Sequence, residues 1–276
     1  GQLTGRPVRV GQSASQRVEA PLSGAIDGPV VVIGAGIAGM SAARALRDAG
    51  AEVTVYDRHG VAGGGASGTP TGLLQPRPLN DGSSLAAFFH AAFEFASRCY
   101  DALDEAWISR GILVLGRDAA DGTRYQALPG AEAVDAAGCQ VVSGIPADTG
   151  GTLFAAGGTL YTREVCAAFG DGVSTRFGNG ITHLARQKDG WRLHLDDASV
   201  QDAAAVILAN GIDAMALSGF SAMALAANRG QISYVAATPI SDQITAPITF
   251  GSYLTPAVDG MHILGATFDR EADWSS

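Results

Sequence analysis

Three glycines, Gly34, Gly36 and Gly39, have the spacing of a turn that binds phosphate groups. In such a turn the first glycine makes the tight bend, the second lets the backbone approach a pyrophosphate, and the third lets the following helix pack closely on the preceding strand. The phosphates then lie at the helix N-terminus, where free N–H groups and the helix dipole favour anions. Because the chain contains 37 glycines, the spacing has meaning only in the right structural context.

The flanking residues supply that context. The apolar run at residues 30–33 predicts a strand buried on both faces, residues 37–49 predict an alanine-rich helix ended by Gly50, and residues 53–56 predict a second strand. Asp57 closes this strand, where a carboxylate can accept both ribose hydroxyls of an adenosine and discourages NADP. The segment 29–57 therefore predicts a dinucleotide site with the candidate residues Gly34, Gly36, Ile37, Ala38, Gly39 and Asp57, and the adjoining Arg58 is a further candidate.

The composition of the loop at residues 60–82 indicates whether the cofactor is a flavin or a nicotinamide nucleotide. It is rich in Gly, Pro, Ser and Thr, whereas an NAD enzyme would normally proceed directly to another helix and strand. Small side chains, backbone N–H groups and hydroxyls lie where the ribityl and isoalloxazine half of FAD would extend. The loop favours FAD and adds the candidates Ala66, Ser67, Gly68, Gly72 and Leu73.

The rest of the chain predicts elements of mixed type. Helices are expected at residues 84–103, capped by Ser83 or Ser84, and at 123–128 and 164–169. Strands are expected at 112–115, on both sides of the Asp189-Gly190 turn, and at 203–208, 231–236 and 262–266.

This order predicts an α/β protein in which a Rossmann-like FAD-binding domain is interleaved with a smaller α+β substrate domain built on a mixed or antiparallel sheet. Residues 29–80 and 150–220 are assigned to the FAD-binding domain, and 81–149 and 221–276 to the substrate domain. Residues 1–28 lack periodicity and are expected to be a linker or loosely attached arm.

Bulk properties exclude some classes of protein. No apolar run approaches the roughly 20 residues of a membrane span. The net charge is −9 and Lys188 is the one lysine, which argues against broad, unaided nucleic-acid binding but leaves room for a local arginine patch. Cys99, Cys139 and Cys166 share no metal-ligand spacing and are expected to be reduced thiols. Because no signal-peptide pattern is visible, the expected compartment is the cytoplasm.

Several segments carry a family resemblance. Gly65-Ala66-Ser67-Gly68, followed by Gly72-Leu73-Leu74, resembles the flavin loop of the D-amino-acid oxidase-like family of FAD oxidoreductases. The strand that enters Ala209-Asn210-Gly211 resembles a late turn of the cofactor domain in that family, and a strand backbone that contacts adenine would match Ile181, unless Ile181 is an ordinary sheet residue. The resemblance adds the cofactor-binding candidates Ile181, Ala209, Asn210 and Gly211.

A closer resemblance lies in the last third of the chain. Residues 229–234, 251–257 and 265–270 are similar to the FAD-dependent oxidoreductase domain of the bifunctional tRNA 5-methylaminomethyl-2-thiouridine biosynthesis proteins, and an Ala92-Phe93 helix and a Gly157-Gly158 turn also fit. The similarity covers residues 29–273. Members of that family continue well past this point with a segment that closes over the flavin, and they carry a methyltransferase domain. We therefore expect either a fragment or a divergent stand-alone form.

The resemblance also implies a reaction. In that family a hydride is removed from the carbon beside a secondary amine, and water hydrolyses the resulting imine. The implied substrate is a carboxymethylaminomethyl group on a tRNA wobble uridine, which is shortened to aminomethyl with release of glyoxylate.

The substrate carboxylate would suit an arginine fork. Arg270 and Arg229 are the catalytic-site candidates for this fork, and Tyr253 is a candidate for a hydrogen bond to the same carboxylate. Instead of binding the carboxylate, both arginines could form ion pairs at the protein surface. His262 either steers the protonation of the amine or has a structural role.

Two other functions stay open at this point. A small-molecule amine or amino-acid oxidase, similar to glycine oxidase or D-amino-acid dehydrogenase, would share the cofactor domain, and the acidic net charge favours it. The C-terminal motifs favour the tRNA substrate instead. A third possibility is a flavin-binding fragment that does not turn over.

Overall fold

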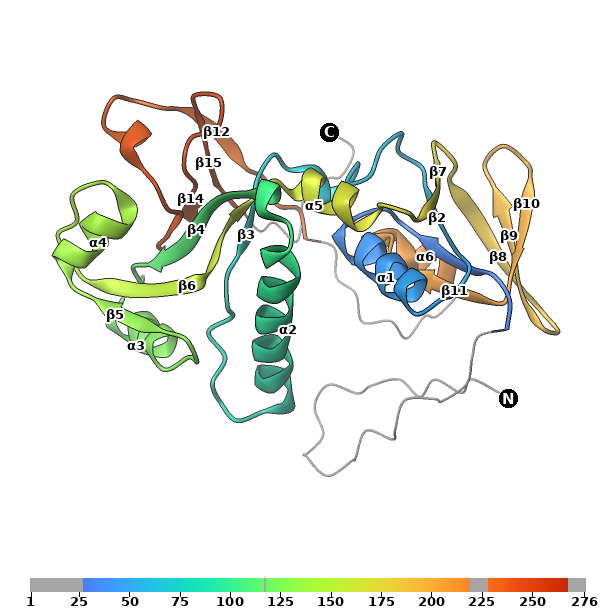
Figure 1. Ribbon diagram of the computed structural model, residues 1–276, viewed down its shortest axis with the longest axis horizontal. Coiled ribbons are helices and arrows are strands. Elements are labelled where there is room, and N and C mark those ends of the chain that lie inside the picture. The colour runs from blue at the N-terminus through green and yellow to red at the C-terminus, as the bar shows by residue number, and fades with distance from the viewer. Residues whose placement is uncertain (1–26, 117, 219–227, 268–276) are drawn as a thin grey trace.

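The computed structural model of the chain describes residues 27–116, 118–218 and 228–267. In Figure 1 a parallel sheet and an antiparallel meander lie on the right, a large mixed sheet lies on the left, and helices α2 and α5 lie between them. Residues 1–26 of the predicted arm, and Arg270, lie outside the described residues. Within them, no helix is both long and apolar enough to cross a membrane.

The parallel sheet has four strands in the order β11-β1-β2-β7. Its strands are β1 (Val30–Ile33), β2 (Val53–Asp57), β7 (Ser174–Phe177) and β11 (Ala205–Leu208), and all three pairings are parallel. The predicted strands at 30–33 and 53–56 are confirmed. Every residue of β1 is buried, as expected for a central strand covered on both faces.

The two faces of this sheet are covered differently. Helices α1 (Ile37–Asp48) and α5 (Thr162–Phe169) cover one face, where Val32 and Val55 pack with Met40 and Val165. The other face carries the meander of β8 (Ile181–Gln187), β9 (Gly190–Leu195) and β10 (Val200–Ala203). The side chains of successive strand residues alternate between the two faces.

The large sheet has eight strands. Seven follow the order β12-β15-β14-β13-β4-β6-β3, and β5 pairs with β6. Among the residues that the structure describes, β13 and β4 form the only parallel pair of this sheet and the other pairs are antiparallel, so the sheet is mixed as predicted. The strands are β3 (Gly72–Leu74), β4 (Trp107–Val114), β5 (Glu132–Val134), β6 (Gly151–Leu160), β12 (Ser233–Ala236), β13 (Ile248–Thr249), β14 (Tyr253–Leu254) and β15 (Met261–Gly265).

The remaining helices surround these sheets. They are α2 (Ser84–Asp101), α3 (Ala119–Gln126), α4 (Ala136–Ser143) and α6 (Ala214–Ser218), with short 3-10 helices at Ala66–Gly68, Asp104–Ala106, Gly211–Asp213 and Ser241–Gln243. The expected cap of α2 is confirmed, because the Ser83 Oγ accepts a hydrogen bond of 3.1 Å from the Ala86 N–H.

Two local expectations were wrong. Gly157 and Gly158 lie inside β6 rather than in a turn. Gly158 has a φ of +152°, and a Cβ at this position would overlap the carbonyl oxygen of Ser109 on β4. The glycine therefore allows β6 to approach β4 closely where the register of the two strands is irregular. Residues 60–82, which were expected to form a loop throughout, also contain β3. This strand lacks a strand-like sequence pattern and is stabilised by its antiparallel pairing with β6.

Strands β3 and β6 pair within the large sheet, although they fall in ranges assigned to the FAD-binding domain. The division of the chain into domains stays a prediction.

Candidate cofactor-binding site

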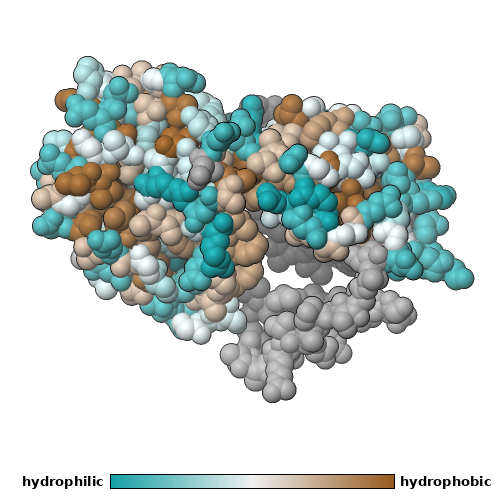
Figure 2. Space-filling model, in the orientation of Figure 1, coloured by the Kyte–Doolittle hydropathy of each residue, from teal (hydrophilic) through white to brown (hydrophobic). Residues whose placement is uncertain are grey.

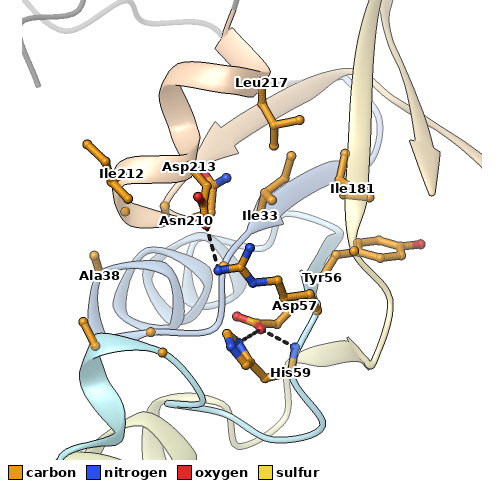
Figure 3. Close-up of a pocket in the computed structure, with 18 of the residues that line it drawn as sticks. Ile33, Ala38, Tyr56, Asp57, His59, Ile181, Asn210, Ile212, Asp213 and Leu217 are labelled. Atoms are coloured by element: carbon orange, nitrogen blue, oxygen red, sulfur yellow. Dashed lines mark hydrogen bonds and ion pairs between the residues drawn. The ribbon is translucent and has the colours of Figure 1, made fainter. Parts of the chain in front are cut away.

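A cavity of about 600 Å³ lies at the carboxyl ends of strands β1, β2 and β11 (Figure 3). Ligands of open α/β sheets bind at this edge. Its walls come from three separate stretches of the chain, residues 33–67, 179–182 and 209–217. Twelve of the predicted cofactor residues line it: Gly34, Gly36, Ile37, Ala38, Asp57, Arg58, Ala66, Ser67, Ile181, Ala209, Asn210 and Gly211.

The glycine turn has the geometry that its spacing predicts. Gly34 adopts a φ of +106°, and a Cβ there would lie 2.5 Å from the Ala209 carbonyl oxygen. A Cβ on Gly39 would overlap the carbonyl oxygen of Gly34, and one on Gly36 would lie 3.1 Å from the Ser67 Oγ. Gly39 therefore serves helix packing without lining the cavity, while the bare backbone of Gly34 and Gly36 borders it.

The N-terminus of α1 opens into this cavity. The helix begins at Ile37 with no side-chain cap on Gly36 and no acidic residue in its first turn. The Ile37 N–H donates a hydrogen bond of 3.1 Å to Ser67 Oγ, which ties the loop at residues 66–68 to the helix end. Free N–H groups and the helix dipole at this end suit an anionic group such as a pyrophosphate.

Asp57 lies beside the turn and is held on both carboxylate oxygens. Its Oδ2 accepts a hydrogen bond of 2.6 Å from the Ala35 N–H, and its Oδ1 accepts one of 2.8 Å from the His59 N–H. The His59 Nδ1 also lies 2.8 Å from Oδ1 (Figure 3). Sequence reasoning missed His59, although its place two residues after Asp57 at the end of a strand was a usable signal.

An ion pair lies at the rim of the cavity. Arg58 Nη2 is 2.9 Å from Asp213 Oδ2, which links the end of β2 to the 3-10 helix after β11. Both side chains are exposed, so the pair contributes little stability.

The cavity wall also includes apolar surface and one unpaired polar atom. Ile33, Ile181 and Leu217 give an apolar surface suited to an aromatic base, and Figure 3 shows them around one end of the cavity. The Oδ1 of Asn210 is buried without a hydrogen-bond partner in the protein. Buried polar atoms are rarely left unpaired, so this oxygen is suited to a ligand donor.

Three loop candidates do not line the cavity. Gly68 packs against Gly63, whose carbonyl oxygen would lie 2.6 Å from a Cβ, and a Cβ on Gly72 would overlap the Thr162 side chain. Leu73 lies in β3, paired with Thr159. The glycines are thus explained by packing, and a role for these three residues in cofactor binding stays a prediction.

The predicted substrate contacts lie elsewhere. Tyr253 lies in β14 beside Thr249 and Gly265, and burial raises its pKa. Neither Tyr253 nor the half-buried Arg229 lines the cavity. His262 is buried, with Nδ1 2.8 Å from the Thr255 carbonyl oxygen and Nε2 3.0 Å from Ser241 Oγ, which fits its structural alternative. The substrate-contact roles of Tyr253, Arg229 and Arg270 stay predictions.

Sequence reasoning missed about half of the cavity wall because these residues come together only in the fold. The missed residues are Ile33, Tyr56, His59, Gly65, Asn179, Gly180, Thr182, Ile212, Asp213, Ala216 and Leu217.

The part of the chain that the structure describes holds no second centre built from cysteines or metal-ligand residues. Cys99, Cys139 and Cys166 are free thiols, and burial raises the pKa of Cys166 to about 11. Among the described residues, no group of three or more His, Cys, Asp or Glu side chains could hold a metal ion.

Comparison with known sequences gives one family. Residues 29–276 match the DAO family, described as FAD dependent oxidoreductase. The chain is 35% identical over 259 residues to the tRNA 5-methylaminomethyl-2-thiouridine biosynthesis bifunctional protein MnmC of Magnetococcus marinus, covering 87% of this chain and 38% of that protein. It is 32% identical over 254 residues to the protein of the same name from Thiobacillus denitrificans, covering 87% and 41%. The chain thus spans about two fifths of the length of these relatives.

Solved structures share the fold at lower identity. Glycine oxidase from Geobacillus kaustophilus has a TM-score of 0.70 and 16% identity, covering 89% of this chain and 72% of that one. L-proline dehydrogenase from P. horikoshii has a TM-score of 0.70 and 14% identity, covering 90% and 71%. Identities this low establish the likeness of fold alone.

Proposed function

Because the chain belongs to the DAO family of FAD dependent oxidoreductases, we propose that it oxidises the C–N bond of a secondary amine on tRNA. The substrate that we propose is the carboxymethylaminomethyl group of a wobble uridine, and the products are the aminomethyl nucleoside and glyoxylate. The observation that carries this proposal is the similarity to the MnmC proteins, at 28–35% identity over 87–91% of the chain.

The cofactor is FAD, and the cavity offers groups for its adenosine diphosphate half. The glycine turn and the N-terminus of α1 would hold the pyrophosphate, and Asp57 would face the ribose. Ile33, Ile181 and Leu217 would surround the adenine. FAD supplies the two-electron oxidation when bound, and the protein supplies orientation, water exclusion and charge.

The residues proposed for the substrate carry complementary chemistry. A carboxymethylaminomethyl group has a carboxylate, which Arg229 or Arg270 would bind through charge-assisted hydrogen bonds and Tyr253 would bind through its hydroxyl. The amine needs to be neutral before it is oxidised, and it can lose its proton to water before it binds. No protein base is therefore required in this proposal.

The partners in this proposal are a tRNA and a methyltransferase domain, fused or separate. The relatives are named bifunctional, and this chain matches about two fifths of their length. In the proposed pathway the methyltransferase would act on the aminomethyl product. With a net charge of −9, the chain is expected to need a local basic surface or its partner to hold the tRNA.

The test supplies the FAD-loaded chain with tRNA that carries carboxymethylaminomethyl-uridine. Glyoxylate is measured as a hydrazone, and the nucleoside is measured by mass spectrometry. We expect equal amounts of glyoxylate and aminomethyl nucleoside. The matched control is tRNA of the same sequence without the modification, which should give neither product.

Two other outcomes would contradict the proposal in different ways. Turnover of glycine, sarcosine or D-amino acids with none on tRNA would identify a small-molecule amine oxidase. Bound flavin that is not bleached anaerobically by any of these substrates would identify a flavin-binding protein without this activity.

A further inference from the structure

His59 makes a double contact with the carboxylate at the ribose end of the cavity. Its main-chain N–H and its ring Nδ1 both lie 2.8 Å from Asp57 Oδ1. An ionised carboxylate only accepts hydrogen bonds, so Nδ1 carries the proton in this contact. Asp57 is nearly buried, with 10% of its side chain exposed, whereas 37% of the His59 side chain is exposed.

The contact with His59 determines which oxygen of the Asp57 carboxylate keeps a free acceptor. Each carboxylate oxygen accepts about two hydrogen bonds. Oδ1 is filled by the two donors of His59, whereas Oδ2 has one protein donor, the Ala35 N–H at 2.6 Å. The acceptor that stays free is therefore on Oδ2.

The ring of His59 is itself held against the glycine loop. A Cβ on Gly64 would overlap His59 Cβ and would lie 2.6 Å from Cγ and 3.1 Å from Nδ1. A Cβ on Gly65, which lines the cavity, would lie 3.8 Å from the His59 Cε1. The His59 side chain therefore packs directly against the backbone of Gly64 on one side, while its Nδ1 contacts Asp57.

We propose that His59 is a positioning residue for the cofactor: its Nδ1–H orients the Asp57 carboxylate so that Oδ2 presents its free acceptor to a ribose hydroxyl of the adenosine. The inference rests on the assignment of Asp57 to the ribose in the proposed function. It adds a residue that acts through Asp57 and connects the ribose end of the cavity to the loop at Gly64 and Gly65.

Isothermal titration with ADP tests this role, because ADP carries the ribose and pyrophosphate but no flavin. The matched ligand is 2′,3′-dideoxy-ADP, which lacks both ribose hydroxyls. His59→Ala should weaken ADP binding about tenfold, a loss typical of a hydrogen bond to a charged group, and should leave dideoxy-ADP binding unchanged. His59→Asn keeps an N–H donor at similar reach, so it should bind ADP within about threefold of the unchanged protein.

Three results would overturn the proposal. Equal losses for both ligands in His59→Ala would show that the ring acts only through packing on the loop. Equal losses in His59→Ala and His59→Asn would show that the Nδ1 donor is not what matters. If the unchanged protein bound ADP and dideoxy-ADP equally, Asp57 would not face a ribose, and the assignment beneath the inference would fail. Absence of tRNA oxidation alters none of these readouts, so the two failures are distinguishable.

Discussion

The carboxyl edge of the parallel sheet and the large mixed sheet are built in different ways. At the parallel sheet, backbone groups of a short continuous segment create the site: Gly34 and Gly36 expose their main chain, and α1 begins at the next residue. In the large sheet, the predicted substrate contact Tyr253 lies in β14 and depends on strands brought together from residues 72–265. The first region is formed by residues that are close in sequence, whereas the second is formed by strands that are distant in sequence.

This difference has an energetic counterpart. Close backbone approach at the glycine turn leaves no room for a side chain, so a small addition disrupts it. The large sheet is stabilised by side-chain burial, with Ile112, Phe154 and Leu128 at the centre of one apolar cluster. A change in the large sheet should therefore lower stability alone, whereas a change at the glycine turn should also lower cofactor affinity.

The largest effect is expected in the large sheet. Phe154→Ala removes a side chain that is 1% exposed and should lower the free energy of unfolding by about 3–5 kcal/mol through lost burial and a cavity. ADP affinity of the folded fraction should stay within about twofold, because Phe154 does not line the cofactor cavity. Urea unfolding and ADP titration measure the two quantities.

Val141→Ala is the matched control for this change. Val141 is 83% exposed on α4, so its truncation should change the free energy of unfolding by less than about 0.5 kcal/mol. Exposed hydrophobic side chains are also seen elsewhere on the surface, as the brown areas of Figure 2 show. A large loss of ADP affinity in folded Phe154→Ala would show that the two regions are coupled.

The next effect is expected at the glycine turn. Gly39→Ala places a methyl group against the carbonyl oxygen of Gly34 and should cost about 1–3 kcal/mol. Unlike Phe154→Ala, it should also weaken FAD binding, because helix α1 must shift away from the turn. Thermal unfolding with and without FAD measures both effects.

Gly60→Ala is the control for the added methyl group, because a Cβ on Gly60 meets nothing within 4 Å. A Gly39→Ala protein with unchanged stability and FAD affinity would contradict the packing role of Gly39.

The region built from residues close in sequence could be predicted from the sequence, whereas much of the large sheet could not. The strand, turn, helix and carboxylate of residues 30–57 were all predicted, because short-range steric demands select glycine at fixed spacings. Strand β6 was missed because its pairing with β3, β4 and β5 is stabilised by long-range contacts, and its glycines suggested a turn. Asp213 was missed because its partner Arg58 is distant in sequence and only the fold brings the two together. His59 was missed although its partner Asp57 lies only two residues before it.

The smallest expected effect is a pH dependence of stability caused by the buried Cys166 thiol of α5. Burial raises the pKa of the Cys166 thiol from 9.0 to about 11 in the folded protein. Between these values the unfolded chain loses the proton while the folded one keeps it, so stability should fall as pH rises from 9.0 towards about 11. Cys166→Ala should make this decline shallower in urea unfolding at pH 8, 9 and 10.

Cys99→Ala is the control, because it removes a half-buried thiol. An unchanged slope in Cys166→Ala would show that this thiol does not contribute to the decline.

A flavin titration of Asp57→Asn tests directly whether the cavity at the parallel sheet holds the adenosine end of FAD. Asp57 lies in that cavity, whereas Asp242 is exposed beside the large sheet and provides the control Asp242→Asn. We predict one FAD per chain, affinity about tenfold weaker in Asp57→Asn, and unchanged affinity in Asp242→Asn. FAD affinity that is the same in all three proteins, or absent from the unchanged chain, would contradict the account.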